Sequence, residues 1–217
     1  MTRLSIAGVG NYMNWSELQK ERLAIRKQFP NFWRLKVIKN VHGLIAQKVK
    51  NGENILDIGA YDRSREVKLK QLSTDIFYRS MDTDRANYQD YYCLEEIKET
   101  FNIILLLEVI EHLPLEEGLG LLGRVFLLLN KGGWLILSTP NLYHPTRFWD
   151  ISHKTPYRYD ELGGLILSLG YQIEGIYRVY NAPFIPRLFR LYLAAPLHRY
   201  LGIDFARSIL IVGRKPL

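Results

Sequence analysis

The stretch NILDIGAYDRS, residues 54–64, places two carboxylates beside a tight loop that follows a predicted buried strand. Nucleotide-binding proteins hold their cofactor in such a loop. A pyrophosphate there requires bare backbone N–H groups and positive charge, so Asp57 and Asp62 disfavour it. S-adenosylmethionine has no phosphate and carries a sulfonium and an ammonium group, which suit nearby carboxylates. The loop therefore favours this cofactor, and its single glycine, Gly59, lets the backbone approach the ligand.

A further carboxylate, Asp82, ends the next predicted strand, about 25 residues after Asp57 and close to the spacing of about 20 residues known for ribose-binding acids. A carboxylate offers only hydrogen-bond acceptors, whereas a ribose diol offers two O–H donors. Asp82 is therefore predicted to bind the ribose of the cofactor. The alternative is an acidic turn residue before a helix, because Asp84 follows closely.

Three of the five histidines, His112, His144 and His153, lie in loops that follow predicted strands. Transfer of an activated methyl group requires an aligned nucleophile and a base that removes its proton, and histidine suits this role near neutral pH. We predict that His153 is the base, against the alternative of a histidine that only orders its loop, and that His112 orients the loop after the fourth strand. His42 and His198 are predicted to be structural or surface residues.

Strands and helices alternate along the chain, which predicts an α/β fold with a doubly wound, mostly parallel sheet. Residues 1–217 are predicted to form a single domain, with helices in residues 1–50 and a basic aromatic insertion at residues 181–206 before the last strand. Strands are expected at 54–59, 76–82, 101–108, 133–140, 171–179 and 208–214. Helices are expected at 15–29, 34–49, 67–72, 115–129 and 159–170, the first capped by Asn14 or Ser16.

Composition sets outer limits on function. The chain has 217 residues, 47% of them apolar, and a formal charge of +7, which permits an anionic partner. The single cysteine, Cys93, excludes a disulfide framework, and no apolar run approaches the roughly 18 to 20 residues that cross a bilayer. We therefore expect a cytoplasmic protein. The segment GVGN, residues 8–11, lacks a flanking strand and a third glycine, so we expect it to bind no cofactor.

The motifs ILDIGAYDRS, MDTD, FNIILLLEVIEHLP and LNKGGWLILSTPN together resemble the successive motifs of class I S-adenosylmethionine-dependent methyltransferases, over roughly residues 50–180. The resemblance implies a Rossmann-like, seven-stranded sheet with helices on both faces and an antiparallel last strand. Ala60-Tyr61-Asp62 stand where further glycines are common in that family. The cofactor-binding residues that the resemblance implies are Asp57, Gly59, Ala60, Tyr61, Asp82, Thr83, Cys93, Leu107 and Glu108.

The segment NLYHPTRFWDISHKTPYRYDEL resembles the region after the fifth strand in bacterial methyltransferases of glycan and surface-polysaccharide assembly. That resemblance implies a sugar or glycan-linked hydroxyl as acceptor. Aromatic rings suit sugar faces, and cations suit phosphate or carboxylate groups. The residues expected to form the acceptor wall are Tyr143, Phe148, Trp149, Tyr157, Arg147 and Lys154.

A metal-dependent reaction is a competing interpretation of EVIEH, although we predict no metal ligands. Glu108, Glu111 and His112 could bind Mg²⁺ together with a later histidine, as sequences of small-RNA 2′-O-methyltransferases and a quinone-precursor O-methyltransferase family resemble this one. The alternative is a structural role, in which Glu111 caps the following helix and His112 packs beside the pocket. An RNA-modifying enzyme, a cofactor-binding module without turnover and an NAD-dependent oxidoreductase are the other classes considered.

The insertion NAPFIPRLFRLYLAAPLHRYLG alternates apolar residues with arginines, and Leu188, Leu191, Tyr192 and Ala195 fall at helical spacing. This pattern predicts a basic amphipathic helix. We expect a lid over the substrate, with peripheral membrane contact through residues 184–201 as the alternative. The oligomeric state is not predicted.

Overall fold

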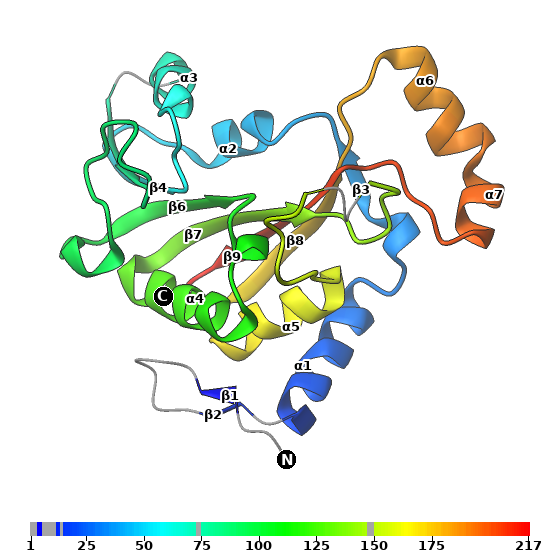
Figure 1. The fold of residues 1–217 in the computed structure, drawn as a ribbon, viewed down its shortest axis with the longest axis horizontal. Helices are drawn as coiled ribbons and strands as arrows, with labels where there is room; N and C mark the ends of the chain where they lie inside the picture. Colours follow the sequence, from blue (N-terminus) through cyan, green and yellow to red (C-terminus); the bar gives the residue numbers. More distant parts are fainter. Residues whose placement is uncertain (1–3, 6–11, 14, 73–74, 147–149) are drawn as a thin grey trace.

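A seven-stranded sheet organises the chain in the computed structural model, which describes residues 4–5, 12–13, 15–72, 75–146 and 150–217 (Figure 1). The strand order is β3-β8-β9-β7-β6-β4-β5. The strands are β3 (Lys36–Ile38), β4 (Glu53–Ile58), β5 (Ile76–Met81), β6 (Phe101–Leu107), β7 (Leu129–Pro140), β8 (Gln172–Val179) and β9 (Ser208–Arg214). A separate pair, β1 (Leu4–Ser5) and β2 (Tyr12–Met13), precedes the sheet.

Helices cover both faces of the sheet. On one face, α1 (Trp15–Gln28), α4 (Leu115–Leu128) and α5 (Tyr159–Ser168) share one apolar core with the strands. On the other, α2 (His42–Lys48) and α3 (Ser64–Leu72) pack in a second core. Side chains alternate between the two: Ile104 and Leu106 of β6 belong to the first core, and Ile103 and Leu105 to the second. A strand buried on both faces is expected to be almost continuously apolar, and FNIILLL is apolar except at Asn102.

The last strand, β9, runs antiparallel to both of its neighbours, β7 and β8, whereas the other pairs within the sheet are parallel. The predicted doubly wound, mostly parallel α/β sheet with an antiparallel last strand is therefore confirmed. Strand β4 lies between β5 and β6, so the connection from β4 to β5 and the connection from β5 to β6 run in opposite directions across the sheet. Ligands of such sheets bind outside the carboxyl ends of the strands at this switch in order.

The helix expected over residues 34–49 is wrong in its first half. Lys36–Ile38 instead form β3, which pairs in parallel with Tyr177–Val179 of β8 at the edge of the sheet, and only His42–Lys48 are helical. The β-branched pair Val37-Ile38 fits a strand, and a partner about 140 residues away selects that conformation over the local helical pattern. The seventh strand thus comes from the N-terminal region. Tyr91, in the segment after β5, makes one isolated parallel bridge to Met81.

Four short helical turns and two helices complete the described part of the chain. The 3₁₀ turns are Phe32–Arg34, Leu94–Glu96 and Ile110–His112, and the projecting region contains α6 (Phe184–Leu188), a π-helical turn (Phe189–Leu193) and α7 (Ala195–Tyr200). Among the described residues, no helix has the length and apolarity to cross a membrane. The segment at residues 8–11 and the expected cap Asn14 lie outside the described residues.

Candidate functional site

Gly59, directly after β4, turns the chain into a narrow loop at the switch in strand order. Its φ is +74°, a conformation that other residues rarely adopt, and a Cβ added there would overlap Cγ2 of Val109. The Gly59 amide donates to the carbonyl oxygen of Met81 at 2.8 Å, which ties the loop to the end of β5. Tyr61 and Arg63 also have positive φ, at 49° and 58°. The loop therefore presents backbone at the carboxyl edge of the sheet, as close approach by a ligand requires.

Asp82 closes the second side of this edge. Its Oδ2 accepts from the Tyr61 amide at 2.9 Å, and its Oδ1 accepts from the Asp84 amide at 3.0 Å. The side chain is only half-buried. A carboxylate has about four lone-pair sites, so both oxygens can accept further donors. This arrangement fits a ribose diol, because Asp82 is held in place by the loop it faces and still has acceptor capacity.

Asp57 faces the interior rather than the ligand edge. It is fully buried, its oxygens accept from Nη1 of Arg65 at 2.9 and 3.0 Å, and the Tyr78 hydroxyl donates to Oδ2 at 2.7 Å. Burial raises the pKa of Asp57, and the Arg65 guanidinium opposes that shift. The loop rim is therefore less acidic than we predicted. Asp57 lies buried beneath the loop, and Arg65 compensates its charge.

Asp62, the other carboxylate of the loop, is exposed and accepts from the Ser64 amide at 3.0 Å. It thus caps the first turn of α3, a common role for aspartate at a helix start. Of the three carboxylates that the sequence placed at this edge, Asp82 alone keeps a geometry suited to a ligand with O–H donors.

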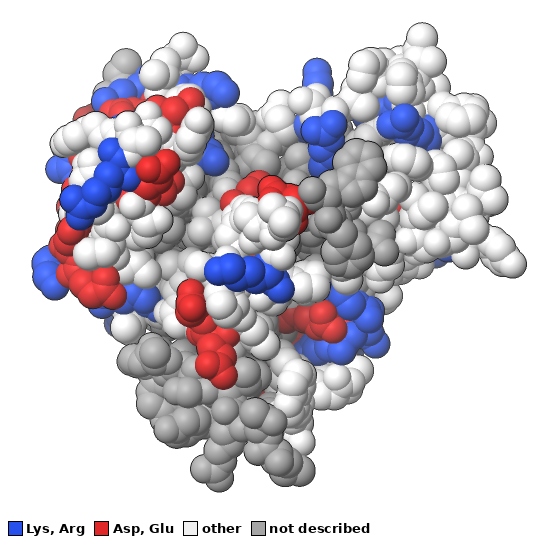
Figure 2. Space-filling model, viewed as in Figure 1, with Lys and Arg blue, Asp and Glu red and all other residues white. Residues whose placement is uncertain are grey.

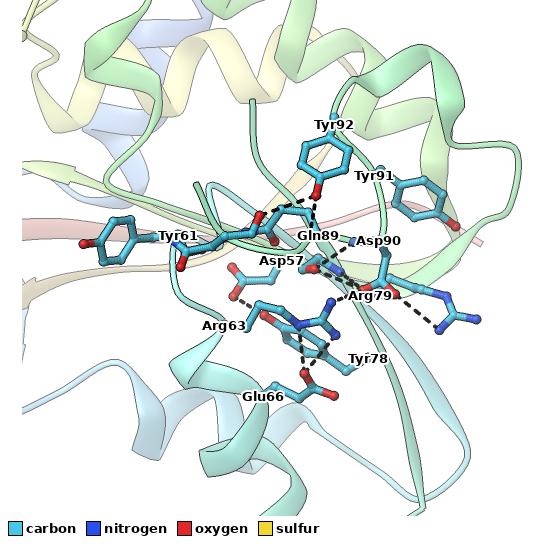
Figure 3. A network of polar contacts seen from close by, with 12 residues as sticks. Asp57, Tyr61, Arg63, Glu66, Tyr78, Arg79, Gln89, Asp90, Tyr91 and Tyr92 are labelled. Carbon is cyan, nitrogen blue, oxygen red and sulfur yellow. Dashed lines mark hydrogen bonds and ion pairs between the residues drawn. The ribbon is translucent and has the colours of Figure 1, made fainter. Parts of the chain in front are cut away.

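A polar network behind the loop was missed by sequence reasoning (Figure 3). Gln89 is buried, and its amide donates to the Tyr61 carbonyl oxygen at 2.7 Å. Asp90 accepts from the amide and hydroxyl of Ser80 at 2.8 and 3.0 Å and pairs with Arg63 at 2.9 Å. These contacts join β5 to the cofactor loop. The local sequence around Gln89 and Asp90 does not indicate this role, because their partners Tyr61 and Arg63 are distant in sequence.

The remaining residues predicted for the cofactor are spread around this edge. Ala60 and Leu107 are buried, Tyr61 and Thr83 are exposed, and Cys93 is half-buried at the start of the 3₁₀ turn Leu94–Glu96. Tyr91, two residues before Cys93, accepts from the Asp82 amide through its carbonyl oxygen at 3.3 Å. The structure thus brings both expected segments to the ends of β4 and β5, and their cofactor contacts stay predictions.

Glu108 follows β6 with a positive φ of 56°, and its carboxylate accepts from the Ser138 hydroxyl at 2.6 Å. It lies on the wall of an open cleft of about 1330 Å³. Desolvation by the surrounding protein raises the pKa of the Glu108 carboxyl, although part of the side chain is exposed to solvent. Five of the described residues lining the cleft are cationic and one, Glu108, is acidic. The cations are Lys39, Arg65, Lys68, Arg190 and Arg207.

His112 and His153 lie together beside the carboxyl ends of β6 and β7, with ring centroids 4.9 Å apart. His153 lines the cleft, and its Nε2 lies 3.7 Å from Oδ2 of Asp150. Ser152 links His112 to Asp150, because its hydroxyl contacts Nδ1 of His112 at 2.9 Å and donates to Oδ1 of Asp150 at 2.6 Å. The structure thus brings the two histidines together, and their roles as base and loop-orienting residue stay predictions.

Glu111 adjoins both histidines. One ligand atom from each of Glu111, His112 and His153 lies within 4.8 Å of the others, which is compact enough for one metal ion. Both Glu111 carboxyl oxygens are buried and have no hydrogen-bond partner among the described residues. Burial, reinforced by Glu108, raises the pKa of Glu111 to about 8. The alternative that Glu111 caps the following helix is wrong, because α4 begins after Pro114 without a side-chain cap.

His144 lies elsewhere in the same cleft. Its Nδ1 contacts the Thr146 hydroxyl at 2.7 Å. Burial lowers the pKa of His144, and Arg207 and Arg190 add to that effect. A neutral imidazole at this position makes His144 the alternative base in the cleft.

One tyrosine of the expected acceptor wall faces away from the cleft. Tyr143 packs against Phe32, with ring centroids 4.5 Å apart, and does not line the cleft. Tyr157 is buried, and together with the exposed Lys154 it lines a smaller cavity beside Glu111 and His153. Arg147, Phe148 and Trp149 lie outside the described residues. The acceptor contacts of Tyr157 and Lys154 therefore stay predictions.

Comparison with known proteins assigns the fold to a family. Residues 31–190 match the profile of the methyltransferase domain family. No curated protein sequence matches the chain significantly. The fold is similar to an S-adenosylmethionine-dependent methyltransferase from Archaeoglobus fulgidus, with a TM-score of 0.60, 14% identity, and coverage of 91% of this chain and 94% of that one.

Two further solved structures share the fold at low identity. A methyltransferase from Methanosarcina mazei gives a TM-score of 0.54 and 12% identity, over 83% of this chain and 100% of that one. One from Mesorhizobium loti gives 0.54 and 12%, over 80% and 96%. The chain belongs to the methyltransferase domain family, as the match over residues 31–190 shows. It shares the fold of these S-adenosylmethionine-dependent methyltransferases, and S-adenosylmethionine stays the predicted cofactor.

Proposed function

We propose that this methyltransferase transfers its methyl group to a hydroxyl of a sugar or glycan that carries phosphate or carboxylate groups. The observation that carries the proposal is the cleft of about 1330 Å³, which adjoins the ends of β6 and β7. Its described lining residues include one carboxylate and five cations, of which Arg65 is paired with Asp57 and four have no such buried partner among the described residues. Clustered cations attract and orient an anionic acceptor. His153 on the same wall supports transfer to a group that must lose a proton.

Each part of the site has a separate role in the proposed reaction. S-adenosylmethionine supplies a methyl group already activated on a sulfonium. Asp82 and the loop at Gly59 hold the cofactor, and the cationic cleft aligns the acceptor hydroxyl in line with the methyl carbon. His153 accepts the hydroxyl proton as the new C–O bond forms and the S–CH₃ bond of the sulfonium breaks, which releases S-adenosylhomocysteine. Asp150 stabilises the resulting imidazolium from 3.7 Å.

A metal-dependent version of the same reaction is the second candidate, favoured by the cluster of Glu111, His112 and His153. The buried, unpartnered oxygens of Glu111 fit a hard cation such as Mg²⁺ or Mn²⁺, and the histidines fit Mn²⁺ better than Mg²⁺. Because the pKa of Glu111 is about 8, a cation there must displace a proton. A metal would polarise the acceptor hydroxyl and lower its pKa.

An acceptor assay tests both versions. The protein is incubated with methyl-labelled S-adenosylmethionine and either a neutral glycan, a matched phosphorylated or uronic-acid glycan, or an RNA oligonucleotide, and the products are located by mass spectrometry. We expect O-methylation of the anionic glycan, in the presence of a chelator. Transfer to RNA alone would contradict the proposal. Loss of transfer on chelation, restored by Mg²⁺ or Mn²⁺ more effectively as pH rises toward 8, would establish the metal-dependent version.

A further inference from the structure

Residues 184–201, which we name the projecting segment, stand out from the edge of the sheet beside β3 (Figure 1). The segment comprises α6, the π-helical turn and α7, and all three leave large apolar side chains in solvent. Nine of the 18 exposed large apolar residues in the described part of the chain belong to it. They are Phe184, Ile185, Leu188, Phe189, Tyr192, Leu193, Leu197, Tyr200 and Leu201.

The charge of the segment is of one sign. From Asn181 to Ile203 the sequence contains no Asp or Glu, and it contains Arg187, Arg190 and Arg199. The same region of the surface is mostly uncharged, with basic groups, in Figure 2. Apolar side chains together with arginines characterise helices that lie in the headgroup region of an anionic membrane.

Contacts of the flanking residues tie both ends of the segment to the rest of the chain. Before it, the Tyr180 amide donates to the Ile38 carbonyl oxygen at 2.9 Å. After it, the buried Asp204 carboxylate pairs with Arg178 at 3.0 Å and accepts from the side-chain amide of Asn141 at 2.9 Å. Burial raises the pKa of Asp204, and Arg178 opposes that shift. The ends of the segment are therefore fixed while its apolar side chains are exposed, and the lid role that we expected stays a prediction.

We propose that the projecting segment binds the surface of an anionic lipid bilayer. Its apolar side chains enter the headgroup and acyl boundary, and Arg187 and Arg199 contact lipid phosphates. A second copy of this chain is the weaker occupant, since like-charged arginines would meet across a symmetric interface.

The segment also borders the cationic cleft, because Arg190 lines it, as do Ala182 and Pro183 directly before the segment. A cleft beside a membrane-bound face suits an acceptor whose glycan is linked to a lipid. This consequence rests on the proposed function, whereas membrane binding itself does not.

Vesicle co-sedimentation tests the inference, with vesicles of phosphatidylcholine alone or with added phosphatidylglycerol. We expect the full chain to sediment with phosphatidylglycerol vesicles and to be released by salt. Ile185→Ser with Leu193→Ser should weaken this partitioning by about tenfold or more, since both side chains are over 70% exposed. Arg187→Gln with Arg199→Gln should weaken it and remove its salt dependence.

The matched control is Val67→Ser with Phe77→Ser, which removes two exposed apolar side chains from α3 and β5 and should leave partitioning unchanged. Affinity for S-adenosylhomocysteine, measured on every variant, verifies folding and separates this test from that of the acceptor. Wild-type protein that stays in solution, or control and segment variants that behave alike, would overturn the inference. So would a dimer in sedimentation velocity that dissociates in Ile185→Ser with Leu193→Ser and binds no vesicles.

Discussion

His153→Gln is expected to lower the rate of methyl transfer by about 10² to 10⁴, the usual contribution of a general base. Glutamine preserves much of the size and polarity of the side chain and cannot accept the acceptor proton. His153 lines the cleft beside Glu108, outside the loop of Gly59 and Asp82, so affinity for S-adenosylhomocysteine should not change. Turnover with saturating cofactor and acceptor, and calorimetry with S-adenosylhomocysteine, measure the two quantities.

His144→Gln is the matched variant, because His144 lines the same cleft without contacting Asp150 in the described structure. It should retain most of the activity. Full activity in His153→Gln with a loss in His144→Gln would move the base to His144, whose lowered pKa keeps it neutral near neutral pH.

Gly59→Ala should weaken cofactor binding by about tenfold to a hundredfold. Alanine at a φ of +74° costs about 1 to 2 kcal/mol, and its Cβ would also displace the side chain of Val109. Either relaxation moves the loop that contacts Asp82. Calorimetric titration with S-adenosylhomocysteine measures the effect.

Gly52→Ala is the control for alanine at a positive φ outside the cofactor loop. Gly52 lies before β4, has a similar φ of +77°, and a Cβ there meets no atom within 4 Å, so affinity should be unchanged. Adding Val109→Ala to Gly59→Ala should recover part of the affinity, because the overlapping methyl is removed. Wild-type affinity in Gly59→Ala would show that the loop does not approach the cofactor closely.

The sheet was largely predictable because its central strands are continuous apolar runs. Strand FNIILLL is buried on both faces, and no other element type accommodates such a run at that length. The edge strand β3 was not predictable in this way, since KVI is short and its partner in β8 is about 140 residues away. Non-local pairing, rather than local preference, decides such a segment.

The positions of the candidate cofactor residues were predictable, and their orientations less so. The glycine after β4 and the aspartate after β5 lie at the same edge of the sheet, where we expect the cofactor. Sequence does not tell which way a side chain points: Asp57 turns inward to Arg65 and Tyr78, and Tyr143 packs on Phe32 instead of facing the cleft. Gln89, whose amide orients the loop through Tyr61, carries no pattern of its own.

Calorimetric titration with S-adenosylhomocysteine, comparing wild-type protein with Asp82→Ala, tests the cofactor site most directly. We predict binding of one ligand per chain in the wild type and a loss of about 1 to 3 kcal/mol in Asp82→Ala, because the ribose hydroxyls and the Tyr61 amide lose an acceptor. Asp84→Ala is the control, since its carboxylate accepts only from the nearby Ala86 amide among the hydrogen bonds described, and it should bind as the wild type does. An unchanged dissociation constant in Asp82→Ala, or no binding by the wild type, would contradict the account.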